Sequence, residues 1–319
     1  MRWSFDKHDD PRAIVRGDFF IYQYEFFCSC AIISFQEIVP SNFGKGETIR
    51  MRLIKVFLQG KKNEMSCEDG YVFCDHYAAV IDGVTSKSEH LFSGKTPGRI
   101  GMEVLCREIP LLDAELTVEQ AVRKLTLALR TEREAMSREH EITLLEYPRA
   151  CAAIYSMARR EIWLIGDCQC RVNEKVYANT KKVDDVMSHL RSFVLQCQLL
   201  SNGDEPEFET DDPGRRAILP FLKQQSLFEN RDCLFGYPVL NGEAIVESQL
   251  VVIPVPKGSL VTLATDGYPV LHESFDESES ALRDLLREDP MCYQKNLQTK
   301  GIQAGNLSFD DRCFLQFTT

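Results

Sequence analysis

The chain has 319 residues, of which 44% are hydrophobic, 27% charged and 10% aromatic. This composition is typical of a soluble globular protein that buries a substantial core. With 37 basic and 48 acidic residues the net charge is −11, which argues against nucleic acid as the main partner because phosphate backbones are bound by clustered lysine and arginine.

The first fifty residues differ from the rest of the chain. Residues 19–35 are aromatic-rich and residues 39–50 have the composition of a linker. The apolar stretch is interrupted by Gln23 and Glu25, so it is too polar to span a bilayer, and it has no clear signal-peptide cleavage pattern. We predict an N-terminal extension of uncertain order over residues 1–50 and a cytoplasmic protein without a membrane partner.

The twelve cysteines are scattered along a long chain, which favours reduced thiols over a disulfide framework. Two Cys-x-Cys pairs occur, Cys28/Cys30 and Cys168/Cys170. In a strand this spacing only places two small side chains on one face, although four thiolates are also a possible zinc site.

From Met51 onwards the chain alternates between short strands and longer helices. Runs of β-branched or aromatic residues bounded by turn residues predict strands at 52–59, 71–74, 77–81, 150–156, 161–165, 249–253, 260–264 and 313–318. Apolar periodicity predicts helices at 96–108, 117–138, 182–200, 215–229 and 278–299. Because neighbouring strands are separated by short turns, we expect antiparallel hairpins. The sequence therefore predicts an α+β domain over residues 51–319, with a sheet-containing sandwich and helices outside.

Several apolar runs meet a carboxylate beside a glycine. These are Glu68-Asp69-Gly70, Asp82-Gly83, Gly166-Asp167 and Asp266-Gly267, while Asp310-Asp311 precedes the last strand. One Asp-Gly pair alone is typical of a turn, but five such sites in one chain favour a shared role. Hard cations such as Mg²⁺ and Mn²⁺ take oxygen ligands, and clustered carboxylates repel one another unless a cation neutralises them. A pair of such ions activates water for in-line displacement.

In this order the residues resemble the metal-dependent Ser/Thr protein phosphatases of the phosphatase 2C type, over about residues 52–319. The chain would be a divergent, bacterial-like member. The resemblance implies a four-layer α/β-β/α sandwich, in which two antiparallel sheets are flanked by helices. It also implies two Mg²⁺ or Mn²⁺ ions and hydrolysis of phosphoserine or phosphothreonine in a phosphoprotein substrate by a metal-activated water.

The resemblance assigns a role to each acidic position. Asp82 would bridge both metals and the Gly83 carbonyl would bind one of them, with Asp266 and Asp310 as the remaining carboxylate ligands. Glu68 and Asp69 would help to hold metal-bound water. Asp167 would be structural.

The chain also departs from the family. Val84 stands where many members have a histidine, the candidate general acid; His76 and His90 are nearby in the sequence. No arginine is evident before Glu68-Asp69, so Lys61 and Lys62 are the basic residues close upstream, and Lys62 is our candidate phosphate-binding residue.

Two other functions compete with this prediction. A haloacid-dehalogenase-type phosphatase needs a nucleophilic aspartate two residues before the Asp of Asp-Gly, and position 80 is valine. A catalytically idle phosphatase-like domain with a binding or regulatory role is the second alternative, favoured by the missing histidine and arginine. The sequence gives no indication of the oligomeric state.

Overall fold

The computed structural model describes residues 14–15, 19–28, 31–40, 51–202 and 210–319. The chain divides into two compact units, Met1–Ile49 and Arg50–Thr319. In the first unit the described backbone forms an antiparallel sheet in the order β1-β2-β3, with β1 at Ile14–Val15, β2 at Phe19–Cys28 and β3 at Ala31–Pro40. The sequence did not predict these strands.

The second unit contains two five-stranded antiparallel sheets, which confirms the predicted fold class. One sheet has the order β10-β9-β12-β13-β4 and the other the order β11-β8-β7-β6-β5. The strands are β4 (Arg52–Gln59), β5 (Asp69–Phe73), β6 (Tyr77–Gly83), β7 (Ala150–Ser156), β8 (Glu161–Ile165), β9 (Gln169–Val172), β10 (Lys175–Ala178), β11 (Val251–Pro254), β12 (Leu260–Ala264) and β13 (Arg312–Thr318).

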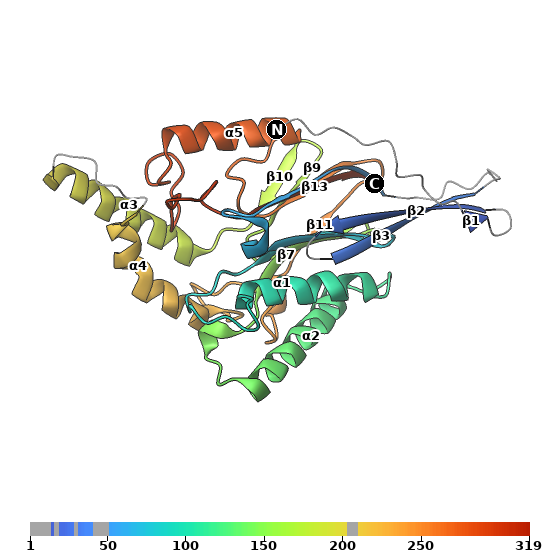
Figure 1. Cartoon of the computed structure of the whole chain (residues 1–319), viewed down its shortest axis with the longest axis horizontal. Coiled ribbons are helices and arrows are strands. Elements are labelled where there is room, and N and C mark those ends of the chain that lie inside the picture. Colours follow the sequence, from blue (N-terminus) through green and yellow to red (C-terminus); the bar gives the residue numbers. More distant parts are fainter. Residues whose placement is uncertain (1–13, 16–18, 29–30, 41–50, 203–209) are drawn as a thin grey trace. The chain divides into compact units, whose positions relative to one another are not determined.

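Helices lie outside the two sheets (Figure 1). On one side α1 (Pro97–Glu108) contacts β5, β6 and β7 and packs against α2 (Val118–Glu139). On the other side α5 (Phe275–Glu288) places Phe275 against Phe57 of β4 and Phe314 of β13. A second helix pair, α3 (Lys182–Asn202) and α4 (Pro213–Gln224), packs together beyond the sheets at one end (Figure 1).

Alternation along the strands builds two cores from one sheet. In β6, Tyr77, Ala79 and Ile81 belong to the apolar cluster shared with α1 and α2, whereas Ala78 and Val80 face the other sheet. Successive strand residues point to opposite faces, so a strand buried on both sides reads as an unbroken apolar run. This is why "YAAVI" was recognisable as a strand in the sequence.

One hairpin was missed by the prediction, and one predicted helix is wrong in its bounds. The short hairpin of β9 and β10 was not predicted, because its strands are four residues each and carry charged side chains. The predicted helix 278–299 ends at Glu288 instead. After it, the Asp289 carboxylate accepts backbone N–H groups from Tyr293, Gln294 and Lys295, and this tight turn replaces the helix.

The ten cysteines that the structure describes are free thiols. Cys170 of β9 and Cys168 directly before this strand are both buried between the sheets, as expected for small side chains on one face, whereas the side chains of Cys28 and Cys30 lie outside the described residues. Within the described part of the chain, no helix has both the length and the apolar character needed to cross a membrane.

Shortening a side chain between the sheets tests this core. Leu315 of β13 is fully buried there, so we expect Leu315→Ala to lower the free energy of unfolding by about 2–5 kcal/mol. Leu127 on α2 is 59% exposed, so Leu127→Ala should change it by less than about 0.5 kcal/mol. Equal losses in denaturant unfolding of the two variants would contradict the assignment of the core.

Candidate metal and phosphate site

The inner faces of the two sheets end in carboxylates at one end of the sandwich. Asp82 continues the face of β6 that Ala78 and Val80 present to the other sheet. The Asp82-Gly83 pair is therefore the end of a strand, two residues longer than predicted, and not a turn. On the neighbouring strand β5, Asp69 is the direct cross-strand partner of Asp82, and like charges at such positions destabilise a sheet.

Hydroxyl groups hold the buried carboxylates in place. The Thr265 hydroxyl at the end of β12 donates to Asp69 Oδ2 at 2.7 Å and accepts the Cys313 backbone N–H at 2.8 Å, which connects the two sheets. The two oxygens of Glu68 accept the hydroxyls of Thr96 at 2.5 Å and Thr85 at 2.6 Å. Glu68 and Asp69 are therefore fixed and almost fully buried.

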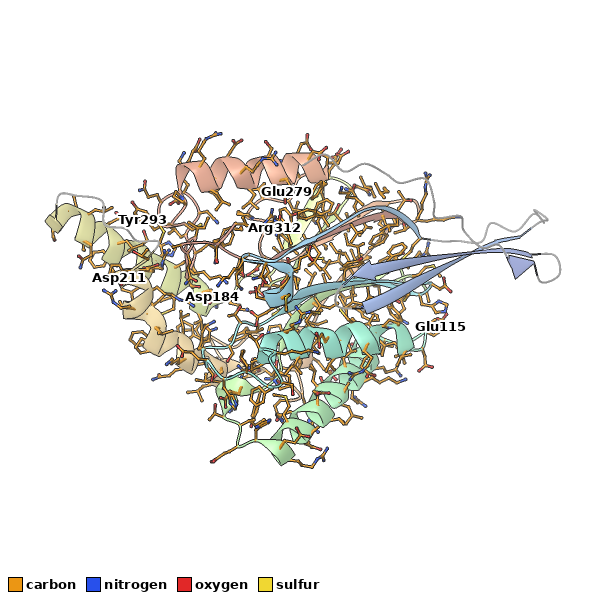
Figure 2. All side chains as sticks on the ribbon, in the orientation of Figure 1. Glu115, Asp184, Asp211, Glu279, Tyr293 and Arg312 are labelled. Atoms are coloured by element: carbon orange, nitrogen blue, oxygen red, sulfur yellow. The ribbon has the colours of Figure 1, made fainter. Side chains whose placement is uncertain are left out.

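Asp311 connects the start of β13 to the segment before β5. Its carboxylate accepts the backbone N–H of Lys61 at 2.6 Å and that of Glu68 at 3.1 Å. Beside it, Arg312 forms a buried ion pair with Glu279 of α5 at 2.8 Å, and both residues are labelled in Figure 2. These contacts set the position of Asp310, which precedes Asp311 and is partly exposed.

Two lysines neutralise Asp310. Lys61 Nζ lies 3.3 Å from one oxygen and Lys300 Nζ lies 2.5 Å from the other. Burial alone would raise the pKa of Asp310, but the charges of Lys300 and Lys61 hold that pKa well below its usual range. Lys61 also contacts Asp311 at 3.2 Å and Glu68 at 3.7 Å, and these carboxylates raise its pKa although burial acts in the opposite direction.

Asp82 and Asp266 are not neutralised in this way. Burial raises the pKa of both carboxyls well above the usual value, and neighbouring charges add to the effect: Asp69, Asp167 and Asp310 on Asp82, and Asp82 and Asp310 on Asp266. In the described part of the chain neither side chain has an ion pair or hydrogen bond. Asp82 raises the pKa of Asp266, so the two carboxyls are close enough to repel each other. Lys181 lowers the pKa of Asp82 and Lys300 that of Asp266, but only in part, and among the described residues these lysines pair with Asp167 and Asp310 instead.

Asp167, predicted to be structural, pairs with a lysine. Lys181 Nζ lies 2.6 Å from Asp167 Oδ2. Burial alone would raise the pKa of Asp167, but Lys181 lowers it below the usual value. The structure thus gives Asp167 a partner that Asp82 and Asp266 lack.

The glycines after Asp82 and Asp266 are needed because another backbone passes close to each. A Cβ on Gly83 would lie 2.3 Å from the carbonyl oxygen of Gly98 in α1, and one on Gly267 would lie 2.1 Å from that of Asp311. The unpredicted strand β9 holds the second turn, because the Gln169 amide donates to the carbonyls of Thr265 and Tyr268. Close packing, rather than a positive φ, explains the glycine at both positions.

Other residues considered from the sequence lie outside this group. Lys62 is exposed, and the lysine that contacts the carboxylates is its neighbour Lys61. His76 is exposed, and His90 pairs with Glu146 at 3.2 Å. Val84, at the position of the family's histidine, packs at the edge of the core between the sheets.

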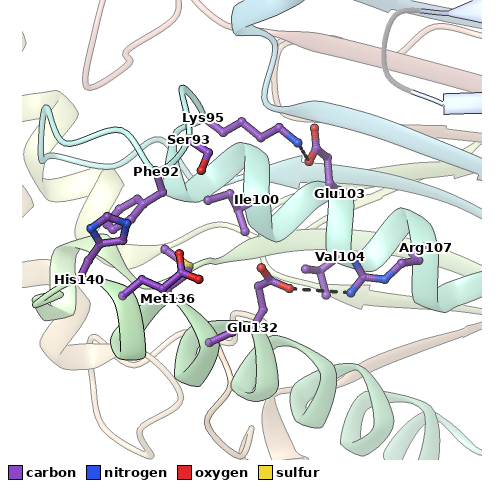
Figure 3. A pocket seen from close by; sticks show the side chains of 12 residues that line it. Phe92, Ser93, Lys95, Ile100, Glu103, Val104, Arg107, Glu132, Met136 and His140 are labelled. Atoms are coloured by element: carbon purple, nitrogen blue, oxygen red, sulfur yellow. Dashed lines mark hydrogen bonds and ion pairs between the residues drawn. The ribbon is translucent and has the colours of Figure 1, made fainter.

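A cavity of about 330 Å³ lies elsewhere, between α1 and α2 (Figure 3). Its lining includes Phe92, Met136 and His140, together with the ion pairs Lys95–Glu103 and Arg107–Glu132. None of the predicted site residues lines it. Since its cations already have carboxylate partners, its charges do not demand a ligand.

The donor chemistry of the acidic group fits a hard divalent cation. Asp82 and Asp266 supply carboxylate oxygens whose pKa values are raised first by burial and then by neighbouring carboxylates, and a cation bound there would relieve this repulsion. Among the described residues, no three His, Cys, Asp or Glu side chains are already arranged as ligands of a metal ion. The fit therefore rests on the chemistry and charge of Asp82 and Asp266, with the Gly83 carbonyl as the neighbouring oxygen.

A scan against protein-family models and a search of curated proteins gave no match. Among solved structures, the chain is similar to several protein phosphatases. The Mycobacterium tuberculosis serine/threonine phosphatase PstP/Ppp is 16% identical, with 84% of this chain and 98% of that chain covered and a TM-score of 0.43. The catalytic domain of PstP in complex with two manganese ions is 15% identical, over 84% and 100% of the two chains, with a TM-score of 0.44.

The serine/threonine phosphatase Stp1 from Staphylococcus aureus is 12% identical, with 87% of this chain and 99% of that chain covered and a TM-score of 0.44. At these identities and scores we base the function of the chain on its own residues.

Removing one of the repelling carboxylates should stabilise the protein when no divalent cation is present. We expect Asp82→Asn to raise the melting temperature at neutral pH in the presence of EDTA, because it removes the charge that opposes Asp69 and raises the pKa of Asp266. Asp284→Asn on the exposed face of α5 is the control. A lower melting temperature for Asp82→Asn than for wild type would show that the carboxylate is stabilising.

Proposed function

We propose that the chain is a metal-dependent phosphatase that hydrolyses phosphoserine or phosphothreonine in proteins through a metal-activated water. The observation that carries the proposal is the pair of partly buried carboxylates, Asp82 and Asp266, which repel each other and form no ion pair in the described part of the chain, while Lys181 and Lys300 offset only part of their pKa shifts. Retaining such a pair is unfavourable for stability alone, so a cationic ligand explains it best. The proposed cofactor is Mg²⁺ or Mn²⁺, with two ions expected from the family resemblance.

Each residue of the site has a defined part in this proposal. Asp82, Asp266 and the Gly83 carbonyl would hold the cation, with Asp310 as a further carboxylate that Lys61 and Lys300 keep ionised. Glu68 and Asp69, fixed by threonine hydroxyls, would accept hydrogen bonds from water at the site. A bound divalent cation supplies nucleophilic water near neutral pH and positive charge for the phosphoryl group.

A second candidate is a catalytically idle domain. It is favoured by the two lysines on Asp310, which already supply positive charge where a metal ligand is expected. The two functions differ in one property: an idle domain of this kind needs no divalent cation at Asp82 and Asp266. The phosphoprotein substrate and the cytoplasmic location remain predictions from the sequence. The assignment of residues 51–319 to one catalytic domain is also such a prediction.

Hydrolysis of p-nitrophenyl phosphate tests the proposal. We expect Mn²⁺-dependent turnover by wild type and a loss of at least about a hundredfold in Asp82→Asn and Asp266→Asn. Each substitution removes a carboxylate ligand of the divalent cation whose charge stabilises the transition state. Asp284→Asn, on exposed α5, should retain wild-type turnover.

The contradicting result is specific. If wild type is as inactive as both variants, and Mn²⁺ raises the melting temperature of none of them, the enzymatic function is wrong and the idle domain is favoured. Turnover that survives both substitutions would instead place the active site elsewhere.

A further inference from the structure

Among the described residues, two basic side chains near the acidic site form no ion pair with a carboxylate. Lys87 Nζ donates to the backbone carbonyl of Thr85 at 2.9 Å, and Arg215 Nη1 donates to that of Thr299 at 2.8 Å. Neither forms an ion pair with a carboxylate in the described part of the chain. Both are only partly exposed, so water compensates their charges incompletely.

Both side chains are held on residues of the site itself. Thr85, whose carbonyl accepts from Lys87, also donates its hydroxyl to Glu68 and accepts a hydrogen bond from Lys61 Nζ at 3.3 Å. Thr299, whose carbonyl accepts from Arg215, directly precedes Lys300. Lys300 Nζ lies 2.5 Å from Asp310 Oδ2. The two unpaired cations therefore border the carboxylates, one from the segment after β6 and the other from the start of α4.

The electrostatics show that these cations repel one another. Burial lowers the pKa of Lys87 to about 7, with further lowering by Arg215 and Lys300. Asp184 on α3 (Figure 2) and Glu68 act in the opposite direction but do not compensate. Burial and the neighbouring Arg191 likewise lower the pKa of Arg215, and the charges of Asp212, Asp184 and Asp310 offset this only in part. An anion between Lys87 and Arg215 would relieve this repulsion, as a cation would between Asp82 and Asp266.

We propose that Lys87 and Arg215 bind the phosphoryl dianion of the substrate, in place of the arginine that is missing ahead of Glu68-Asp69. The guanidinium of Arg215 can contact two phosphoryl oxygens at once, and the ammonium of Lys87 acts as a point charge. This inference rests on the proposed function, because only a phosphatase would make the bound anion the phosphoryl group that is hydrolysed. It replaces Lys62, which is exposed, as the phosphate-binding residue.

Sulfate is a suitable probe because it remains a dianion throughout the neutral range and is not hydrolysed. Binding is measured by isothermal titration calorimetry on the full chain without divalent metal, at low ionic strength. We expect Lys87→Met and Arg215→Gln each to weaken binding by about tenfold or more, since each removes a charge-assisted contact. Arg216→Gln is the matched control, because Arg216 is the exposed neighbour that pairs with Asp211, and it should bind sulfate as wild type does.

The pH dependence separates a charge contact from a general loss of structure. Lys87 is protonated below its lowered pKa of about 7 and loses its charge above it, so wild-type affinity should fall as the pH rises through about 7. Lys87→Arg keeps its charge over this range and should bind sulfate with little change in affinity. Circular dichroism verifies that each variant is folded.

The proposal is overturned if folded wild type binds no sulfate at millimolar concentration, or if Lys87→Met and Arg215→Gln bind it as wild type does. Competition identifies the source of the anion: O-phosphoserine displacing sulfate supports a monoester substrate, and a failure to displace it contradicts the assignment. Because no step requires turnover, sulfate binding without hydrolysis would leave these residues as an anion site while the proposed catalytic function fails.

Discussion

The site depends on a single constraint, the repulsion between carboxylates gathered where the apolar faces of two sheets end. Asp69 and Asp82 lie directly opposite each other on neighbouring strands, and Asp266 arrives from the facing sheet close enough for its pKa to be raised by Asp82. The fold fixes this arrangement with hydroxyl donors and with glycines that let other backbones pass within contact distance. It neutralises Asp310 with two lysines and leaves Asp82 and Asp266 without such partners, which is why we assign them to a metal.

The same constraint explains how the charges of the site are divided. Among the described residues, two carboxylates, Asp82 and Asp266, form no ion pair with a protein cation, and two cations, Lys87 and Arg215, form none with a protein carboxylate. A divalent cation and a phosphoryl group bound together would satisfy both sets at once, and each ligand would bind more tightly in the presence of the other. The proposed metal-assisted reaction at phosphorus draws on this charge distribution, with the protein supplying position and charge.

The sequence predicted the strands that carry the carboxylates because those strands are buried on both sides and read as unbroken apolar runs. It also singled out Asp82, Asp266 and Asp310 as candidates, because acidic positions next to predicted strands recur five times along the chain. It could not predict β9, whose four residues include a glutamine and an arginine. This strand pairs with β12, and Gln169 holds the turn that carries Asp266.

Lys61 was noted only as a basic residue upstream of Glu68, with Lys62 as the phosphate-binding candidate, and the other basic residues were not predicted. Lys61, Lys87, Arg215 and Lys300 come from four separate segments, and their meeting depends on how the loops between elements pack. Only Lys87 has a local signal, since it follows Gly83 by four residues, but a lone lysine there is indistinguishable from a solvated side chain. Charged residues that come together only through tertiary structure leave no pattern in the sequence. A buried strand, in contrast, is visible as an unbroken apolar run.

The most direct test of the metal assignment is the anomalous scattering of manganese from crystals of the protein grown with Mn²⁺. We predict an anomalous peak bonded to the Asp82 and Asp266 carboxylates, with the Gly83 carbonyl among its nearest oxygens. Crystals that contain Mn²⁺ at saturating concentration but show no peak at these carboxylates would contradict the central claim.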